Sequence, residues 1–164
     1  MMPKWRVECG EWRTLAQQRE AALRLLCSLL AEEVAVEHDD NGAPWLPNHP
    51  ELSVSISHCR AAVAVAVSDA EAIGIDIECR RRVSPGLVER VCTEEEQEII
   101  RGAADTEMEF LRYWTRKEAV LKMRRTGIKG FGSMQEALSA KDCTVEDVDC
   151  GRPDVVAAVA RAKV

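Results

Sequence analysis

The sequence predicts an α+β protein, because a run of strand patterns lies between two helical regions. Good helix formers fill residues 12–33, alternating apolar residues mark three strands between residues 52 and 78, and helical spacing follows from 84 to 125. The chain has 164 residues, of which 46% are hydrophobic. That is enough for one compact domain or for two small fused halves with a common core.

The first helix is predicted from the segment "WRTLAQQREAALRLLCSLLAEE", residues 12–33. Helical spacing places Leu15, Ala22 and Leu26 near one face. Residues 38–51 contain Asn, Asp, Gly and three prolines, which predicts a loop between this helix and the strands.

Two strands follow the loop. In "LSVSISH", residues 52–58, apolar residues alternate with serines, which predicts a half-buried strand that ends at His58. The segment "AAVAVAVS", residues 61–68, is apolar throughout and is typical of a strand covered on both sides. Because so few residues separate the two segments, we expect a hairpin with His58 at its tip.

A third strand, "AIGIDIE" at residues 72–78, has isoleucines on one face and Gly74, Asp76 and Glu78 on the other. Side chains two residues apart in a strand point the same way, so the two carboxylates lie close together and repel one another. A bound cation would offset that repulsion, and Mg²⁺ prefers such oxygen ligands. The alternative is a strand end in which both carboxylates are solvated.

Helix signals follow the strands. Ser84 and the proline after it form a cap and first turn, and "TEEE" at 93–96 predicts a capping box for a helix that stops at Gly102. Two further strands are predicted near the end of the chain, at 145–148 and 155–159.

The last predicted helix spans residues 106–125 and is closed by Gly127. Glu118 lies within its apolar stripe, where an unpaired charge is costly. This suggests a third ligand for the cation near the strand. The alternative is an ion pair between Glu118 and Lys122, one turn further on. The apolar positions of the stripe are Phe110, Leu111, Trp114 and Leu121.

Charge and cysteine usage narrow the class of protein. The net charge of −6 disfavours a general nucleic-acid-binding surface, although it permits a local basic pocket. No apolar run approaches a membrane span and the N-terminus lacks a secretory signal, so we expect a soluble cytoplasmic protein. None of the seven cysteines pairs at two-residue spacing, which disfavours a disulfide framework or a thiolate zinc site.

Four motifs occur in a fixed order: "GAPWLP" at 42–47, "SISH" at 55–58, "GIDIE" at 74–78 and "WTRKEAVLK" at 114–122. In this order the motifs resemble the 4'-phosphopantetheinyl transferase superfamily, over roughly residues 42–131. The strand G-[IV]-D-[IV]-E and the helix W-[STC]-x-K-E-[AS]-x-x-K are the patterns that carry the resemblance.

The aspartate of this strand follows a helix and two strands, which is similar to the larger, pseudo-dimeric type of the superfamily, the surfactin-synthetase-activating type, with a shortened N-terminal half. The resemblance implies two pseudo-symmetric halves, residues 1–72 and 73–164. Each would be a small antiparallel sheet packed by a helix. The C-terminal half would carry the metal site, and the active site would lie in the cleft between the halves.

The activity that the resemblance implies is holo-[acyl-carrier-protein] synthase activity. The 4'-phosphopantetheine arm of coenzyme A would be transferred to a serine of an apo acyl or peptidyl carrier protein, with Mg²⁺, releasing 3',5'-ADP. Such reactions serve fatty-acid, polyketide and nonribosomal peptide biosynthesis. The expected partners are coenzyme A and the carrier protein, with no nucleic acid or membrane, and a monomer is expected, with a dimer as the alternative.

The resemblance also implies roles for residues at the matching positions. Asp76, Glu78 and Glu118 would hold Mg²⁺ on the diphosphate of coenzyme A. Asp76, Glu118 and Lys122 would be catalytic: Glu118, or a metal-bound water beside it, would be the base for the serine, and Lys122 would neutralise the phosphates or the leaving group. Without this context, a lysine at this spacing is more often part of a surface ion pair.

Coenzyme A binding would involve four residues in all: Ser57, His58 and Lys122 at a phosphate, and one arginine of the first helix. Arg13, Arg19 and Arg24 are the alternatives for the last role, and helical phase slightly favours Arg24. His58 at a hairpin tip is also compatible with a solvent-exposed side chain.

Two positions depart from the family pattern. Ala43 stands where the family usually has a lysine or arginine, and Cys59 stands where it often has serine or threonine. A competing hypothesis is therefore a catalytically impaired relative that acts as a carrier-protein or coenzyme A-binding module. An unrelated magnesium phosphohydrolase would use similar carboxylates, but has no reason to keep "SISH" and "KEAVLK" together.

Overall fold

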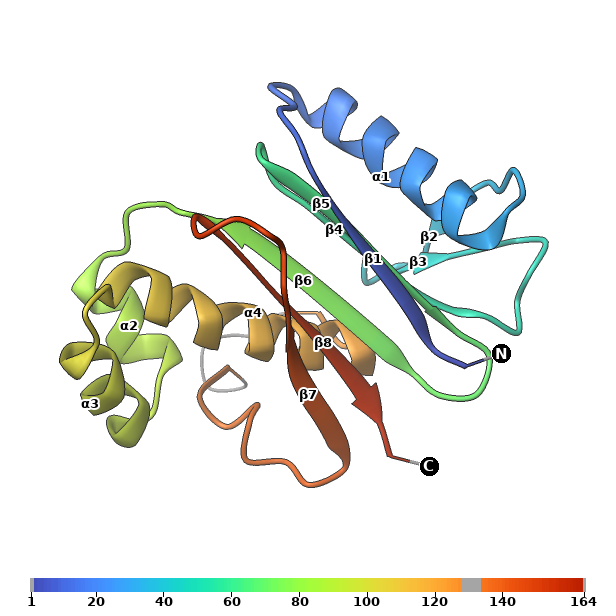
Figure 1. Ribbon diagram of the computed structural model, residues 1–164. Coiled ribbons are helices and arrows are strands. Elements are labelled where there is room, and N and C mark those ends of the chain that lie inside the picture. The colour runs from blue at the N-terminus through green and yellow to red at the C-terminus, as the bar shows by residue number, and fades with distance from the viewer. Residues whose placement is uncertain (1, 128–133, 164) are drawn as a thin grey trace.

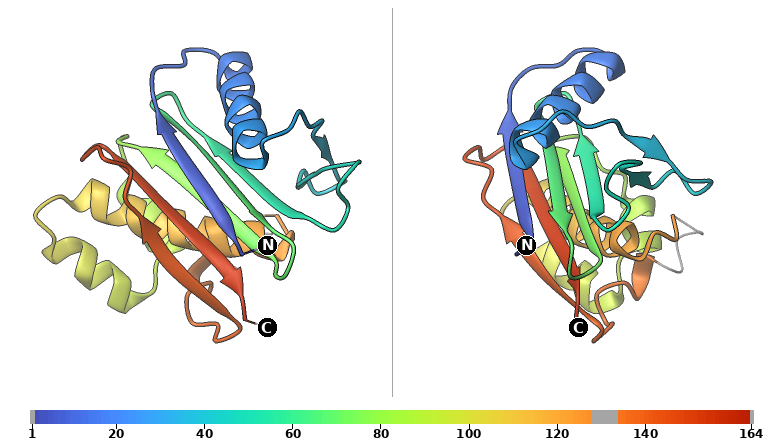
Figure 2. Two further views of the ribbon diagram at one scale, coloured as in Figure 1. Left: turned by 45° about the vertical axis from the view of Figure 1, so that its right-hand side comes forward. Right: turned by 90° about the vertical axis from the view of Figure 1, so that its right-hand side faces the viewer.

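The computed structural model describes residues 2–127 and 134–163. Within these residues, two three-stranded antiparallel sheets pack against each other, and a long helix covers the outer face of each sheet (Figures 1 and 2). The predicted α+β class with small antiparallel sheets is confirmed.

The first sheet has the strand order β1-β5-β4, with β1 at Lys4–Cys9, β5 at Ala62–Ser68 and β4 at Ser53–His58. Helix α1, Leu15–Leu30, packs on it and begins after the N-cap Thr14 in a complete capping box. The predicted helix and the β4–β5 hairpin are confirmed, whereas β1 was missed. Its alternation of polar and half-buried residues is the signal that marks it as a strand.

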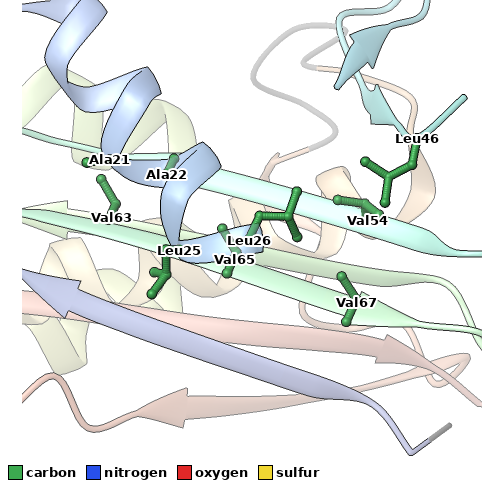
Figure 3. Close-up of a cluster of buried hydrophobic side chains, with 9 residues drawn as sticks. All are labelled: Ala21, Ala22, Leu25, Leu26, Leu46, Val54, Val63, Val65 and Val67. Atoms are coloured by element: carbon green, nitrogen blue, oxygen red, sulfur yellow. The ribbon is translucent and has the colours of Figure 1, made fainter. Parts of the chain in front are cut away.

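Strand β5 is buried on both faces, as predicted. Its valines point toward α1 and its alanines toward the second sheet, because side chains alternate along a strand. Figure 3 shows the valine side packed against the helix. The residues in this cluster are Ala21, Ala22, Leu25, Leu26, Leu46, Val54, Val63, Val65 and Val67.

The second sheet has the order β6-β8-β7, with β6 at Ile73–Cys79, β8 at Val155–Ala162 and β7 at Cys143–Val148. Helix α4, Thr106–Arg124, packs on β6 and β8 (Figure 1). The third strand and both late strands are confirmed. The strands of the first sheet all precede those of the second in the chain.

Three serines of β4 join the two sheets. β6 is an edge strand, so the amides on its free side need partners from outside its own sheet. Each serine hydroxyl accepts a hydrogen bond from one of these amides. The pairs are Ser53 with Ile73 (3.1 Å), Ser55 with Ile75 (2.9 Å) and Ser57 with Ile77 (3.1 Å). The prediction of a half-buried strand was therefore wrong for the serine face, since Ser55 and Ser57 are only 3% and 6% exposed.

Two short helices lead into α4. Helix α2 spans Pro85–Val91 after the N-cap Ser84, and α3 spans Glu94–Gly102 after the N-cap Thr93, as predicted. The predicted capping box is only half formed. Thr93 accepts from the amide of Glu96, but the Glu96 carboxylate binds a buried lysine of α4 instead of reaching back to the cap.

The predicted loop at 38–51 contains one small two-stranded hairpin, which pairs β2 at Glu37–His38 with β3 at Pro44–Trp45. Helix α4 ends at Arg124, one residue earlier than predicted. Its C-cap is Arg125 in a left-handed conformation, so Gly127 lies beyond the cap.

The described residues include no helix long and apolar enough to cross a membrane. All seven cysteines are free, and the sequence predicted no disulfide framework.

Candidate active site

A close contact between α4 and β6 positions the acidic residues. A Cβ atom at Gly74 would lie 2.1 Å from the carbonyl oxygen of Ala119 and 2.4 Å from the amide nitrogen of Met123. Only glycine allows the helix backbone to lie this close to the strand. Asp76 is the next residue after Gly74 on the face of β6 that points toward α4. Glu118 precedes Ala119 on the helix, so the contact brings the two carboxylates together.

Asp76 is held by groups from two other elements. The Lys122 ammonium donates to its Oδ1 atom at 2.7 Å, and the Ser57 hydroxyl donates to the same oxygen at 3.0 Å. Asp76 is 5% exposed, which rules out the alternative of a solvated strand end at this position. Its second oxygen, Oδ2, is buried and has no hydrogen-bond partner in the described part of the chain.

The three carboxylates of the site carry more negative charge than the neighbouring cations, Lys122 and Arg81, can offset. Burial and the repulsion of Asp76 raise the pKa of Glu78, although Arg81 contacts this carboxylate at 3.4 Å. Burial, followed by the repulsion of Asp76, raises the pKa of Glu118 to about 7, against the opposing effect of Lys122. The three predicted carboxylates are therefore close enough to perturb one another.

The ion pairs of the described residues do not include the alternative pair between Glu118 and Lys122. The Lys122 ammonium crosses from helix to strand and binds Asp76 instead. A lysine that pairs with a buried aspartate remains close to any ligand of that site, whereas a surface pair on the helix would not.

The donor set fits a magnesium ion by its chemistry. Three carboxylates are ligands that Mg²⁺ prefers, and the buried Oδ2 of Asp76 has an unused acceptor. Among residues 2–127 and 134–163, however, no three acidic, histidine or cysteine side chains are already gathered around a metal position. Like-charged carboxylates repel at short range when no cation lies between them. That Asp76, Glu78 and Glu118 share one ion stays a prediction.

A cavity of about 210 Å³ lies beside these groups, between the loop before β3, strand β4 and the end of α4. It adjoins a larger cavity of about 620 Å³ near α1, because Gly42, Pro44 and Ile56 line both. The charged or polar residues of the first are Asn41, Ser55, Glu118, Lys122 and Arg125. Those of the second are Arg19, His38 and His58.

One of the three candidate arginines, Arg19, lines the larger cavity. Arg19 lines it together with Ala22 and Leu23, which lie on the same helical face at spacings of three and four. Arg19 and Arg24 are both exposed, and Arg24 does not line this cavity. The phosphate role expected of Arg24 stays a prediction, with Arg19 as the alternative beside this cavity.

His58 lies at the end of β4 in the wall of the larger cavity, partly buried rather than fully solvated. Its Nδ1 atom lies 3.0 Å from Oε1 of Gln18. Burial lowers the pKa of His58, and the positive charges of Lys122 and Arg19 lower it further. This places one histidine and two cations along the same groove.

Ser57 has a different neighbour from the predicted one. Its hydroxyl donates to Asp76 and accepts from the amide of Ile77, so both of these contacts are internal. In this arrangement Ser57 orients the aspartate. Its contact with a phosphate stays a prediction.

Sequence reasoning missed Lys117, which is fully buried beside Glu118. Its ammonium contacts the Glu96 carboxylate at 2.7 Å and donates to the carbonyl oxygens of Met134 and Gln135, each at 2.9 Å. The signal was present in the apolar stripe, because position 117 lies three or four residues from positions 114 and 121. Lys117 therefore ties α4 to α3 and to the segment at 134–135.

The fold and this site together define an α+β protein with an acidic strand–helix centre beside a partly cationic groove. A family model described as the 4'-phosphopantetheinyl transferase superfamily matches residues 72–160, more than half of the chain. The chain belongs to this superfamily, as its motifs indicated.

One curated relative is the 4'-phosphopantetheinyl transferase HetI of Nostoc sp. (strain PCC 7120). It is 32% identical over 114 residues, which cover 65% of this chain and 48% of HetI. The chain spans about half the length of the curated relative it matches.

Proposed function

We propose that this chain transfers the 4'-phosphopantetheine arm of coenzyme A to a serine of an apo acyl or peptidyl carrier protein, and that it requires magnesium. The observation that carries the proposal is the contact of Lys122 with Asp76 next to Glu118, in the wall of a cavity, in a member of this superfamily. The arrangement brings acids and a cation to one place, as phosphoryl transfer requires.

In the proposed reaction, the serine oxygen forms a bond to the β-phosphorus of coenzyme A. The bond from that phosphorus to the oxygen bridging to the α-phosphate breaks, which releases 3',5'-ADP. The serine proton passes to Glu118, the candidate general base beside the cavity. Lys122 offsets the charge that develops on the leaving group.

Asp76, Glu78 and Glu118 are the residues that would hold magnesium. When bound, the ion would neutralise charge on the diphosphate and hold it in position. The chain's own part is to keep the acids in place. Ser57 and Lys122 fix Asp76, and Gly74 sets the approach of the helix.

The larger cavity is the proposed site for the adenosine phosphate end of coenzyme A. Arg19 and His58 line it, and a guanidinium binds phosphate oxygens well. This assigns to Arg19 the role first considered for Arg24.

We propose further that the two sheet–helix units are pseudo-symmetric halves, residues 1–72 and 73–164, of the pseudo-dimeric type. Each sheet has three antiparallel strands and one long helix on its outer face, which supports this arrangement. The protein would act as a cytoplasmic monomer.

The test is incubation with coenzyme A, magnesium and a panel of apo carrier proteins, read by intact mass for addition of the phosphopantetheine arm. The wild-type protein should modify at least one partner, and Glu118→Gln should abolish transfer. Glu98→Gln removes an equal charge at an exposed position of α3 and should leave transfer unchanged. Failure with every partner, in a folded protein that still binds coenzyme A in calorimetry, would favour the binding-module alternative.

A further inference from the structure

The wall of the smaller cavity contains a cation that the motifs did not single out. Arg125 lines this cavity together with Ala43, Glu118 and Lys122. The Lys122 ammonium lies on the strand side of this cavity, where it pairs with Asp76. Arg125 is the other cation in the wall of this cavity among the described residues.

The backbone of Arg125 has an unusual conformation for its residue type. It caps α4 with a φ of 56°, in the left-handed region where helices commonly end in glycine. Residues other than glycine keep this left-handed conformation when surrounding contacts hold them in it, and such positions cluster at functional sites. The conformation directs the chain at the end of α4 toward the loop before β3.

Three contacts join Arg125 to that loop. Its Nη1 atom donates to the carbonyl oxygen of Pro44 at 3.1 Å, and its Nη2 atom donates to Asp39 at 3.1 Å. The Asn41 side chain donates to the Arg125 carbonyl oxygen at 3.3 Å. Asp39 in turn accepts from the amide of Ala43 at 2.9 Å. The guanidinium therefore lies against the stretch of chain that carries Ala43.

The contact between Arg125 and Pro44 places a positive charge next to Ala43, which carries none. Ala43 contributes only a methyl group to the cavity wall, while the guanidinium beside it is 35% exposed. A guanidinium has five N–H donors, so the two contacts through Nη1 and Nη2 leave donors for a ligand. Its planar fork matches phosphate oxygens.

We propose that Arg125 binds the diphosphate of coenzyme A in this cavity and supplies the positive charge that the alanine at position 43 does not. Asp39 is a positioning residue, which holds the guanidinium against the loop. The inference rests on the proposed function, because it takes coenzyme A as the ligand.

The experiment measures coenzyme A affinity by calorimetry in magnesium for the wild type, Arg125→Ala and a matched control. The control is Arg124→Ala, which removes the same charge one residue away. Arg124 pairs with Asp142 at 3.2 Å and does not line the cavity. Loss of a charged donor to phosphate should weaken affinity about 10- to 100-fold in Arg125→Ala, with a change below about 2-fold in the control.

A second variant separates ligand binding from a purely structural clamp. Ala43→Arg in the Arg125→Ala background returns a guanidinium to the same wall without restoring the contacts with Asp39. It should recover most of the lost affinity and the salt dependence of binding, because phosphate contacts weaken as salt rises. Thermal melting checks that each variant is folded.

The outcomes distinguish the inference from the function on which it rests. If the wild type binds coenzyme A and Arg125→Ala binds it equally well, the role of Arg125 is wrong and the proposed function stands. A loss that Ala43→Arg fails to restore also overturns it, in favour of a clamp. If the wild type does not bind coenzyme A, the proposed function fails and the role of Arg125 with it.

Discussion

Replacing Glu118 by glutamine should stabilise the metal-free protein at alkaline pH and have little effect in acid. The Glu118 carboxyl has its pKa raised from 4.5 to about 7, chiefly by burial and then by the charge of Asp76. The unfolded chain loses this proton near the lower value and the folded chain near the higher one. Between the two values the folded state binds more protons, so its stability falls as pH rises toward 7.

The size of the effect follows from the shift. From pH 5 to the folded pKa of about 7 there are roughly two units, each worth about 1.4 kcal/mol, which gives an upper limit of about 2.7 kcal/mol. Partial exposure of the side chain reduces this to about 1–2 kcal/mol. Glutamine carries no charge at either pH, so Glu118→Gln should not show this loss.

The assay is urea unfolding, followed by tryptophan fluorescence, at pH 5 and pH 8 in the presence of a metal chelator. The free energy of unfolding of the variant minus that of the wild type should rise by about 1–2 kcal/mol between the two pH values. Glu98→Gln, on the exposed face of α3, should show no such change. Magnesium at pH 8 should stabilise the wild type more than Glu118→Gln. Equal pH dependence in the two proteins would refute the account of Glu118 as a buried, uncompensated acid.

Two further predictions concern the support of the site. Gly74→Ala should lower the free energy of unfolding by about 3 kcal/mol or more, because the new Cβ overlaps the backbone of Ala119. Chemical unfolding measures this loss. The control is Gly102→Ala, whose new Cβ meets no atom within 4 Å. Lys117→Met should cost about 3–5 kcal/mol, because it leaves Glu96 partly buried and unpaired. Adding Glu96→Gln should restore part of that loss, and an equal cost in single and double variants would contradict the pairing.

The sequence predicted those parts of the fold that local periodicity controls. Strand patterns along residues 52–78 identified three strands, and the family resemblance carried by the GIDIE and KEA motifs predicted that Asp76 and Glu118 lie in one site. Strand β1 was predictable by the same rule, but its residues alternate only between exposed and half-buried, so its alternation is weaker.

Contacts between distant segments account for the errors. A serine on a strand face is normally assigned to solvent, and the amides that occupy Ser55 and Ser57 belong to a strand 20 residues later. Lys117 was overlooked because a charged residue is rarely buried completely, and its partner Glu96 lies on another helix. The helix alone does not reveal which arginine of α1 adjoins the larger cavity, because the position of that cavity also depends on β3 and β4.

The position of the acidic centre is set mainly by backbone contacts and depends little on attraction between its charged groups. The serines of β4 fix β6 by its own amides, and Gly74 fixes the distance from β6 to α4. Asp76 is thereby held between Ser57 and Lys122 even though its acidic neighbours repel it. Neutralising Glu118 should therefore change the charge of the site without moving its frame. We therefore expect this one substitution to abolish the proposed transfer and yet to stabilise the metal-free fold.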